Sequence, residues 1–447
     1  MESINMKKDV VFLFLVFVLY VGIRLVPFFS TFQNNSRFFL VDSYEYNLLG
    51  INIEQHGYYL PHGGEPGLRR SPGYPLYLAA VYRFLGQKPA IALFLQILLS
   101  GLTPLLLYMN ANLLFSKRVA RIASALSVIE PVSIIYANIL LSETIFVIFL
   151  LLSTYFFIKS LKQKSTSALV MAAVTTGIGA YFRPVILYLP LAYAFTYIAV
   201  SWLSFKDRIL HAAGIIVLTA VAVAPWFVRN YVVDRYKGFC SIQDVNLYYY
   251  RAAGVISDIE DLPLKTVQDR LKAAVPAGLS LVNKYQFMRD KAFNVIVHHP
   301  YAYGKVMMKG SINMLLSPER YAVFKLAGIP PRFLGIMWQG HSVREALHIM
   351  MSDPFIVSSA VIYQLVFTVL TGLLMLIGIL VIAGEGYIRE LLTLLFIIAY
   401  FIVVSAGPEA EPRFRLPVLP YMLILAAVAI SALFTSVASK HYKKRIQ

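Results

Sequence analysis

The sequence predicts an all-α membrane protein with about ten transmembrane helices. Of its 447 residues, 58% are hydrophobic and only 14% are charged, whereas soluble domains carry about 25% charged residues. The apolar residues form ten runs of roughly 20 residues, the length that an α-helix needs to cross a bilayer. These runs lie at residues 10–29, 89–113, 119–138, 142–158, 168–182, 184–204, 209–228, 357–383, 389–405 and 416–437.

Basic residues orient these spans. Forty Lys and Arg against 23 Asp and Glu give a net charge of +17. The basic residues gather at both ends of the chain and in alternate short loops, as expected for cytoplasmic segments. Because membrane topology accounts for the positive charge, DNA binding is disfavoured. An even number of spans places both termini inside. The basic residues on this side are Lys7, Lys8, Lys117, Arg118, Arg121, Lys159, Lys162, Lys164, Lys206, Arg208, Arg389, Lys440, Lys443, Lys444 and Arg445.

Two longer polar stretches divide the chain, and both are predicted to lie outside. We expect residues 1–228 to form a transmembrane catalytic module, whose first outer loop, residues 30–88, carries amphipathic helices. Residues 229–356 are long enough for a smaller, mainly helical outer domain. Residues 357–447 supply the last spans and a basic cytoplasmic tail.

The predicted topology depends on the runs at 168–182 and 184–204, which Arg183-Pro184 interrupts. Proline either ends a helix or kinks it. A single kinked span here would reduce the count to nine and place residues 229–356 inside. Glu130, which precedes Pro131 within the third run, similarly predicts an early helix end.

The chain matches no P-loop, dinucleotide-binding, HExxH or GxSxG pattern. Its single cysteine, Cys240, allows no intrachain disulfide, and its histidines lack the clustering typical of metal ligands. We therefore expect no metal and no cofactor, and we expect carboxylates and arginines to carry the chemistry.

Ionisable side chains gather at the outer ends of the predicted spans, where they are functional candidates because burying them unpaired is costly. A transporter would place such groups near the bilayer midplane, so this one-sided placement favours an enzyme. Asp42 could also be an N-cap, with Glu45 completing a capping box, and Glu143 could simply favour a helix N-terminus. The group comprises Asp42, Glu45, Arg69, Arg70, Glu143, Arg183, Arg229, Glu411, Arg413 and Arg415.

Several short motifs, in this order along the ten spans, resemble the GT-C class of membrane glycosyltransferases. The resemblance is to the bacterial protein mannosyltransferase-like branch, which includes the aminoarabinose transferases of lipid A. The motifs are Asp42, Arg70-Ser71-Pro72-Gly73-Tyr74-Pro75-Leu76-Tyr77-Leu78, Leu141-Ser142-Glu143, Arg183-Pro184, Pro225-Trp226-Phe227-Val228-Arg229-Asn230-Tyr231, His299-Pro300-Tyr301 and Glu411-Pro412-Arg413-Phe414-Arg415-Leu416-Pro417.

The resemblance implies an enzyme that transfers one hexose or pentose from a polyprenyl-phosphate carrier, such as undecaprenyl phosphate, to an acceptor hydroxyl. The acceptor would be a lipid, glycan or protein, as in lipopolysaccharide or protein glycosylation of the cell envelope. It also implies inversion at the anomeric carbon. The enzyme would be a multi-pass protein of the bacterial inner membrane, with its active site on the periplasmic or extracellular face.

The resemblance also assigns roles to residues of this sequence. Asp42 corresponds to the catalytic aspartate of the first loop, a candidate general base. Glu143 is preferred to Glu45 as the second acidic residue, because it matches the Ser-Glu position of the family. Arginine forks suit phosphate oxygens, which makes Arg70, Arg183, Arg229 and Arg413 the candidates for binding the donor phosphate. The additional candidates are Glu45, Arg69, Tyr74 and Arg415.

Two alternatives remain open at this stage. A polymerase or ligase that moves a whole polyprenyl-linked glycan is also multispanning and also has arginines on its outer face. A lipid-linked sugar flippase or transporter would explain the spans without a base, although the one-sided placement of polar groups speaks against it.

Overall fold

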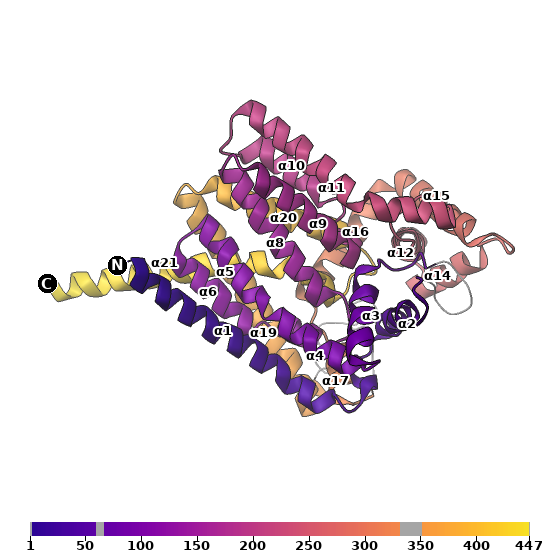
Figure 1. Ribbon diagram of the computed structural model, residues 1–447, viewed down its shortest axis with the longest axis horizontal. Coiled ribbons are helices and arrows are strands. Elements are labelled where there is room, and N and C mark those ends of the chain that lie inside the picture. Colours follow the sequence, from indigo (N-terminus) through magenta and orange to yellow (C-terminus); the bar gives the residue numbers. More distant parts are fainter. Residues whose placement is uncertain (1, 60–66, 331–350, 447) are drawn as a thin grey trace.

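The computed structural model describes residues 2–59, 67–330 and 351–446, and every regular element in these ranges is a helix. The all-α prediction is therefore confirmed. Long helices lie side by side with both termini at one end of the bundle, and shorter helices gather at the opposite end (Figure 1). Residues 63–66 of the glycine-rich first loop and residues 331–350 of the expected outer domain lie outside the described residues.

Each of the ten apolar runs coincides with a helix or a broken helix. Among the described residues, six helices are long and apolar enough to cross a membrane, and a bent pair would be a seventh; three others are apolar but shorter. The count of ten thus remains a prediction. The elements are α1 (Glu2–Thr31), α4 (Pro89–Ser100) with α5 (Leu102–Leu114), α6 (Lys117–Val128) with α7 (Pro131–Ala137), α8 (Glu143–Lys162), α9 (Thr166–Phe182), α10 (Leu189–Val200), α11 (Phe205–Asp234), α19 (Phe355–Gly384), α20 (Ile388–Ser405) and α21 (Leu419–Ile446).

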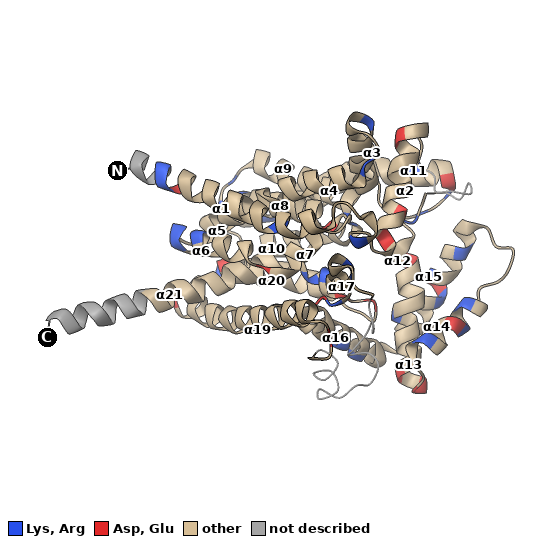
Figure 2. Ribbon diagram, turned by 90° about the horizontal axis from the view of Figure 1, so that it is seen from below, with Lys and Arg blue, Asp and Glu red and all other residues tan. Residues whose placement is uncertain are grey.

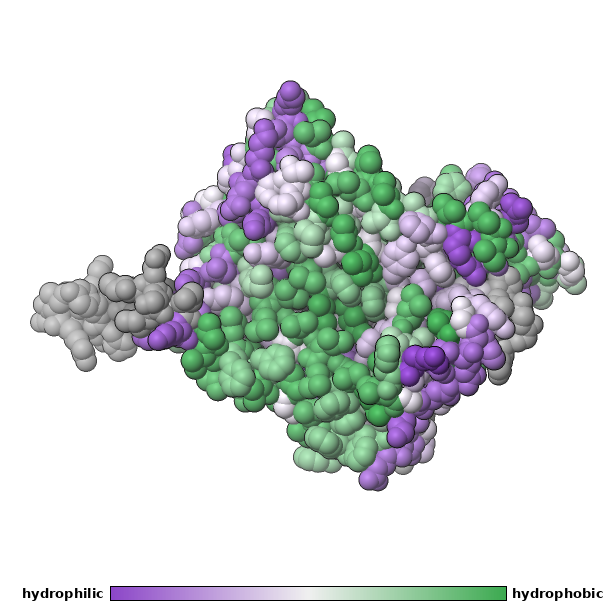
Figure 3. Space-filling view, in the orientation of Figure 1, coloured by the Kyte–Doolittle hydropathy of each residue, from purple (hydrophilic) through white to green (hydrophobic). Residues whose placement is uncertain are grey.

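Helix α8 lies at the centre of the bundle. In the most apolar stretch of α8, 72% of the residues are buried, whereas the corresponding shares for α1 and α19 are 22% and 17%. The exposed apolar side chains form a hydrophobic surface over the middle of the bundle, with hydrophilic groups toward its ends (Figure 3). This arrangement is that of a membrane protein, with α1 and α19 on the lipid-facing surface.

The chain reverses direction between α9 and α10. The Ser153 hydroxyl of α8 lies 2.6 Å from the Thr176 hydroxyl of α9 and 3.2 Å from the Tyr193 hydroxyl of α10. Farther along, Ser201, just beyond α10, donates to the Leu161 carbonyl of α8 at 3.0 Å. Residue numbers of α10 therefore rise along α8 while those of α9 fall. Arg183-Pro184 ends one helix and does not kink a single span, because Arg183 is extended (φ −143°).

The third apolar run is broken where Glu130 precedes Pro131, as the sequence predicts. Helix α6 ends at Val128, and α7 is bent from it by 54°. The Glu130 carboxylate caps α7 by accepting the backbone N–H groups of Val132 (3.0 Å) and Ser133 (2.5 Å). Glu130 thus satisfies helix donors that would otherwise be orphaned within an apolar bundle.

Shorter helices cover the end of the bundle away from the termini, and charged residues are frequent along them (Figure 2). From the first loop come η1 (Asn35–Arg37), α2 (Val41–His56) and α3 (Gly73–Leu85). Residues 236–316, here called the cap, contain α12 (Ile242–Asn246), the π-helix η3 (Leu247–Ala252), α13 (Ala253–Glu260), α14 (Leu264–Ala273), α15 (Leu281–His298) and α16 (Pro300–Leu316). Three further short elements are η2 (Pro184–Ile186), α17 (Tyr321–Ala327) and η4 (Pro412–Arg415).

The cap has a small hydrophobic core of its own. Tyr236, Tyr248, Tyr285 and Met288 pack together there, and Leu68 from the first loop joins them with 1% of its surface exposed. The Ser241 N–H also donates to the Leu68 carbonyl at 2.8 Å. The cap therefore fixes the segment that leads directly into Arg69 and Arg70.

Candidate active site

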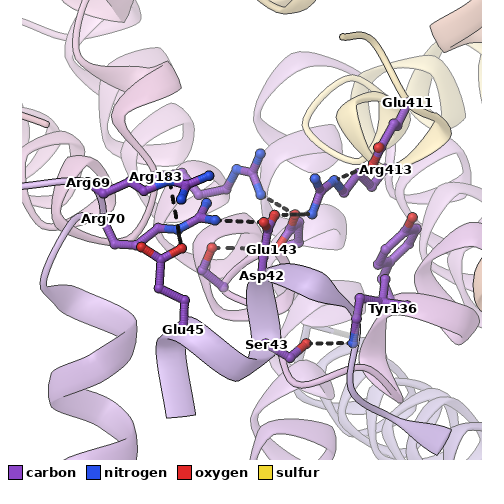
Figure 4. Close-up of polar contacts among 12 residues, drawn as sticks. Asp42, Ser43, Glu45, Arg69, Arg70, Tyr136, Glu143, Arg183, Glu411 and Arg413 are labelled. Carbon is purple, nitrogen blue, oxygen red and sulfur yellow. Dashed lines mark hydrogen bonds and ion pairs between the residues drawn. The ribbon is translucent and has the colours of Figure 1, made fainter. Parts of the chain in front are cut away.

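Asp42 lies between two arginines that are far from it in the sequence. Its Oδ1 accepts a hydrogen bond from Arg70 Nη2 at 2.6 Å, and its Oδ2 accepts one from Arg413 Nη1 at 2.8 Å (Figure 4). Asp42 is in the first turn of α2, where a negative charge is favoured by the helix dipole. Arg70 precedes α3, and Arg413 is in η4 before α21. Both carboxylate oxygens are thus engaged by guanidinium groups.

The helix-capping alternative for Asp42 is wrong. The residue at the N-cap of α2 is Leu40, and the Leu40 N–H donates to the hydroxyl of Ser43 at 3.0 Å. Ser43 is therefore the residue three positions after the N-cap whose side chain accepts the N-cap backbone N–H, as in a capping box. The carboxylates of Asp42 and Glu45 are instead directed at arginines.

Arg413 stands among three carboxylates. Besides Asp42, its Nη1 lies 3.7 Å from Glu143 Oε1, and its Nε lies 2.8 Å from Glu411 Oε2. Glu143, the first residue of α8, is almost fully buried and forms a close ion pair with Arg183, which caps the C-terminus of α9. Glu143 therefore lies close to two arginines, both of which follow it in the sequence but belong to different segments of the fold.

Glu45 extends this cluster toward solvent. Its Oε2 accepts a hydrogen bond from Arg70 Nε at 2.8 Å and lies 3.9 Å from Arg69 Nε. The Arg69 side chain is 53% exposed, whereas that of Arg70 is 9% exposed. Arg70 is therefore the buried anchor between two α2 carboxylates, and Arg69 lies at the rim.

The paired charges keep the site ionised. Burial alone would raise the pKa of Asp42, but the Arg413 and Arg70 guanidinium groups outweigh it and hold that pKa well below its usual range. Burial would lower the pKa of Arg413, but the carboxylates of Glu411, Asp42 and Glu143 raise it above its ordinary value. Asp42 is therefore a carboxylate, and Arg413 a guanidinium, across the neutral range of pH.

Tyr74 supports the cluster from behind. Its buried hydroxyl donates to Gln96 Oε1 at 2.7 Å. Its ring packs edge-on against Tyr46 at a centroid distance of 5.2 Å, and the Arg70 guanidinium carbon lies 5.3 Å from the Tyr46 ring. Tyr74 thus holds the aromatic surface against which Arg70 rests.

Two of the predicted arginines have their partners elsewhere. Arg229 forms a close ion pair with Asp234 on the same helix, and its guanidinium carbon lies 5.2 Å from the Trp226 ring. Arg415 is fully buried and donates to the Leu315 carbonyl at 2.5 Å. Within the described residues, no hydrogen bond or ion pair places either side chain in the cluster around Asp42.

Tyr136 and Glu319 adjoin the cluster and were not singled out from the sequence. Tyr136 lies beside Arg413 and Glu411 (Figure 4), and its hydroxyl donates to the buried Glu319 carboxylate. Glu319 also accepts a hydrogen bond at 3.0 Å from the Ala322 N–H, which lies in the first turn of α17. Burial raises the pKa of Glu319. No sequence signal marks this pair, because its members are 183 residues apart.

Comparisons with known proteins indicate what kind of fold positions this cluster. Residues 69–226 match the family model of dolichyl-phosphate-mannose-protein mannosyltransferase. The structure resembles that of the archaeal oligosaccharyltransferase AglB from Archaeoglobus fulgidus in complex with an inhibitory peptide and a dolichol-phosphate: TM-score 0.60, 16% identity, covering 99% of this chain and 52% of that chain. The chain has a GT-C fold.

Other comparisons give the extent of this likeness. The apo form of the same oligosaccharyltransferase has a TM-score of 0.56 at 14% identity, over 98% of this chain and 52% of that one. The chain thus spans about half the length of these proteins. ArnT from Cupriavidus metallidurans, bound to undecaprenyl phosphate, has a TM-score of 0.43 at 15% identity, over 92% and 77% of the two chains. The sequence matches no curated protein. Asp42 and Arg413 lie outside residues 69–226, the segment that matches the family model.

Proposed function

We propose that the chain is a membrane glycosyltransferase that moves one sugar from a polyprenyl-phosphate carrier to an acceptor hydroxyl on the outer face of the membrane. The observation that carries this proposal is the position of Asp42, held between Arg70 and Arg413 at one end of the helical bundle. A carboxylate and several guanidinium groups are the chemistry that glycosyl transfer from a lipid phosphate requires. The GT-C fold and the match to the mannosyltransferase family model support it.

Asp42 is the proposed general base. It would take the proton of the acceptor hydroxyl as the acceptor oxygen bonds to the anomeric carbon. The bond from that carbon to the phosphate oxygen breaks in the same step, and its electron pair leaves with the lipid phosphate. A direct displacement of this kind inverts the anomeric configuration.

The departing phosphate gains negative charge, which Arg70, Arg183 and Arg413 would stabilise. Bidentate bonds from guanidinium groups suit phosphate oxygens. Glu143, the proposed second acidic residue, holds Arg183 and lies 3.7 Å from Arg413, so it would position both cations. Arg229 is left out of this set because its side chain is paired with Asp234.

Donor binding and activation of Asp42 would then be linked. In the structure both Asp42 oxygens accept bonds from guanidinium groups, and the low pKa makes Asp42 a weak base. A donor phosphate competing for Arg70 and Arg413 would free an Asp42 oxygen and raise its pKa. The base would become effective only when a donor is present.

The proposed topology places residues 229–356, with the cap, outside and both termini inside. It is supported by the basic residues at the end of the bundle that holds the termini, and by the reversal of the chain between α9 and α10. We further propose that the membrane is the bacterial inner membrane and that the site faces the periplasm.

Cysteine labelling tests this topology in intact cells. In a Cys240→Ser background, cysteines would replace the exposed residues Ser36 and Ala277 as outer sites and Ser167 as an inner site. A membrane-impermeant thiol reagent is expected to label residues 36 and 277 directly, and residue 167 only after permeabilisation. Labelling of residue 277 only after permeabilisation would place the cap inside and separate it from the proposed lipid donor.

The transfer reaction tests the function itself. Purified protein would be given polyprenyl-monophosphate-linked monosaccharides and candidate acceptors. Polyprenyl phosphate and a glycosylated acceptor are expected to form in equal amounts. Consumption only of diphosphate-linked oligosaccharides would favour the polymerase or ligase alternative. Movement of the lipid-linked sugar across vesicles, with no transfer, would favour a flippase.

A further inference from the structure

The loop that leads to Arg413 is held by the cap. This loop, residues 406–411, joins α20 to η4. Arg251 of the cap donates from Nε to Glu409 Oε1 at 2.9 Å and from Nη2 to the Val404 carbonyl at 2.7 Å. Asn313 of α16 donates to the Ala410 carbonyl at 2.7 Å. The cap thus supplies hydrogen bonds before, within and near the end of the loop.

Two glycines of the cap allow it to approach this loop closely. A Cβ atom at Gly310 of α16 would overlap the backbone of Gly407, and one at Gly254 of α13 would lie 2.5 Å from Pro408 Cγ. Gly407 itself has a φ of 144°, which side-chain-bearing residues rarely adopt. The loop therefore fits against two helices with no room for a methyl group at either contact.

Arg251 is presented by an unusual piece of helix. It belongs to η3, a single π-helical turn, and such turns occur frequently at functional sites. The side chains of Arg251 and Glu409 are only 20% and 8% exposed. A buried ion pair contributes little net stability compared with apolar packing, but it can select one arrangement of the two segments that it joins.

We propose that the cap positions Arg413 for the donor phosphate, because its hydrogen bonds and close packing hold residues 406–411 in place. Arg251, Gly310 and Asn313 are the positioning residues. The inference rests on the proposed function, because it assumes that Arg413 binds the phosphate. Pro412, whose ring restricts φ, directly connects the gripped loop to Arg413. A shift of the loop is therefore passed to the guanidinium group, and a misplacement of about 1 Å at a site can cost on the order of 100-fold in rate.

Two glycine substitutions on the same helix test whether the cap holds residues 406–411 in place. Gly310→Ala places its methyl group against the Gly407 backbone, whereas a Cβ at Gly304 of α16 meets nothing within 4 Å. In full-length protein, Gly310→Ala is expected to lower kcat/KM for the donor at least about tenfold, with the KM of the acceptor unchanged. Gly304→Ala is expected to retain wild-type kinetics. Equal donor kinetics in the two variants would overturn the proposal.

A double-mutant cycle separates positioning from general damage to the fold, and it covers the case in which Gly310→Ala does not fold. If Arg251 acts through Arg413, removing both as Arg251→Ala and Arg413→Ala should cost clearly less than the product of the two single losses in donor kcat/KM. Arg251→Lys, which keeps the charge beside Glu409, should lose less than Arg251→Ala. Arg270→Ala, which breaks the exposed cap pair with Glu260, is the control.

The outcomes of this cycle also separate the two proposals. Fully multiplicative losses would overturn the positioning role of Arg251 and leave the phosphate role of Arg413 intact. A wild-type donor kcat/KM in the single variant Arg413→Ala would instead overturn the role of Arg413 in binding the phosphate, which belongs to the proposed function.

Discussion

Asp42→Asn is expected to lower sugar transfer at least about 100-fold at unchanged expression, the usual size of a general-base effect. Asparagine keeps the size of the side chain and can still accept one hydrogen bond from an arginine, but it cannot take a proton at neutral pH. The measurement is initial-rate transfer by purified protein with a polyprenyl-phosphate sugar. Glu54→Gln is the matched control, because Glu54 is on the same helix but pairs with the exposed Arg83. Near-normal turnover in Asp42→Asn would leave Asp42 only as an anchor for the arginines.

The pH profile provides a second readout of Asp42 in the same experiment. Because kcat/KM reports the free enzyme and the pKa of Asp42 lies below the ordinary value of about 3.9, Asp42 should contribute no loss of kcat/KM between about pH 7 and pH 5. The profile of kcat reports the donor complex, in which the arginines engage the phosphate. Its acidic limb should therefore lie at higher pH than that of kcat/KM. Coincident limbs would contradict the release of Asp42 by the donor.

Arg413→Ala is expected to lower kcat on the order of 100-fold, as removal of a preorganised donor to a developing oxyanion does. The loss should exceed that of Arg70→Ala, because Arg413 lies among Asp42, Glu143 and Glu411. Arg413→Lys should recover only part of the rate, since lysine keeps the charge but lacks the bidentate fork. Arg83→Ala, whose side chain is 73% exposed, is the control. Wild-type donor affinity and rate in both Ala variants would exclude the phosphate site.

The helices of the bundle were predictable because backbone groups in a bilayer are satisfied within each segment. Every apolar run read from the sequence coincides with a helix or a bent pair, and the break at Glu130 follows from proline chemistry. The count of spans is less determined, since helices such as α10 are shorter than a bilayer requires. The reversal at Arg183 became clear only from hydrogen bonds between helices.

The sequence also placed the charged residues at one end of the bundle but not their pairing. Asp42 and Arg413 are 371 residues apart, and only the folding of the whole chain brings their side chains together. The same limit explains Arg229 and Arg415, which have partners that sequence position alone does not reveal. The cap can pack closely against residues 406–411 only because Gly310 and Gly254 have no side chain at the contacts. Such contacts have no periodic signal along the chain.

A structure of the full-length protein with polyprenyl phosphate bound tests the central claim most directly. We expect phosphate oxygens about 2.7–2.9 Å from guanidinium nitrogens of Arg70 or Arg413, with at least one oxygen of Asp42 released from its arginine and facing the site. A phosphate bound away from these arginines, with Asp42 still paired to both, would contradict the account.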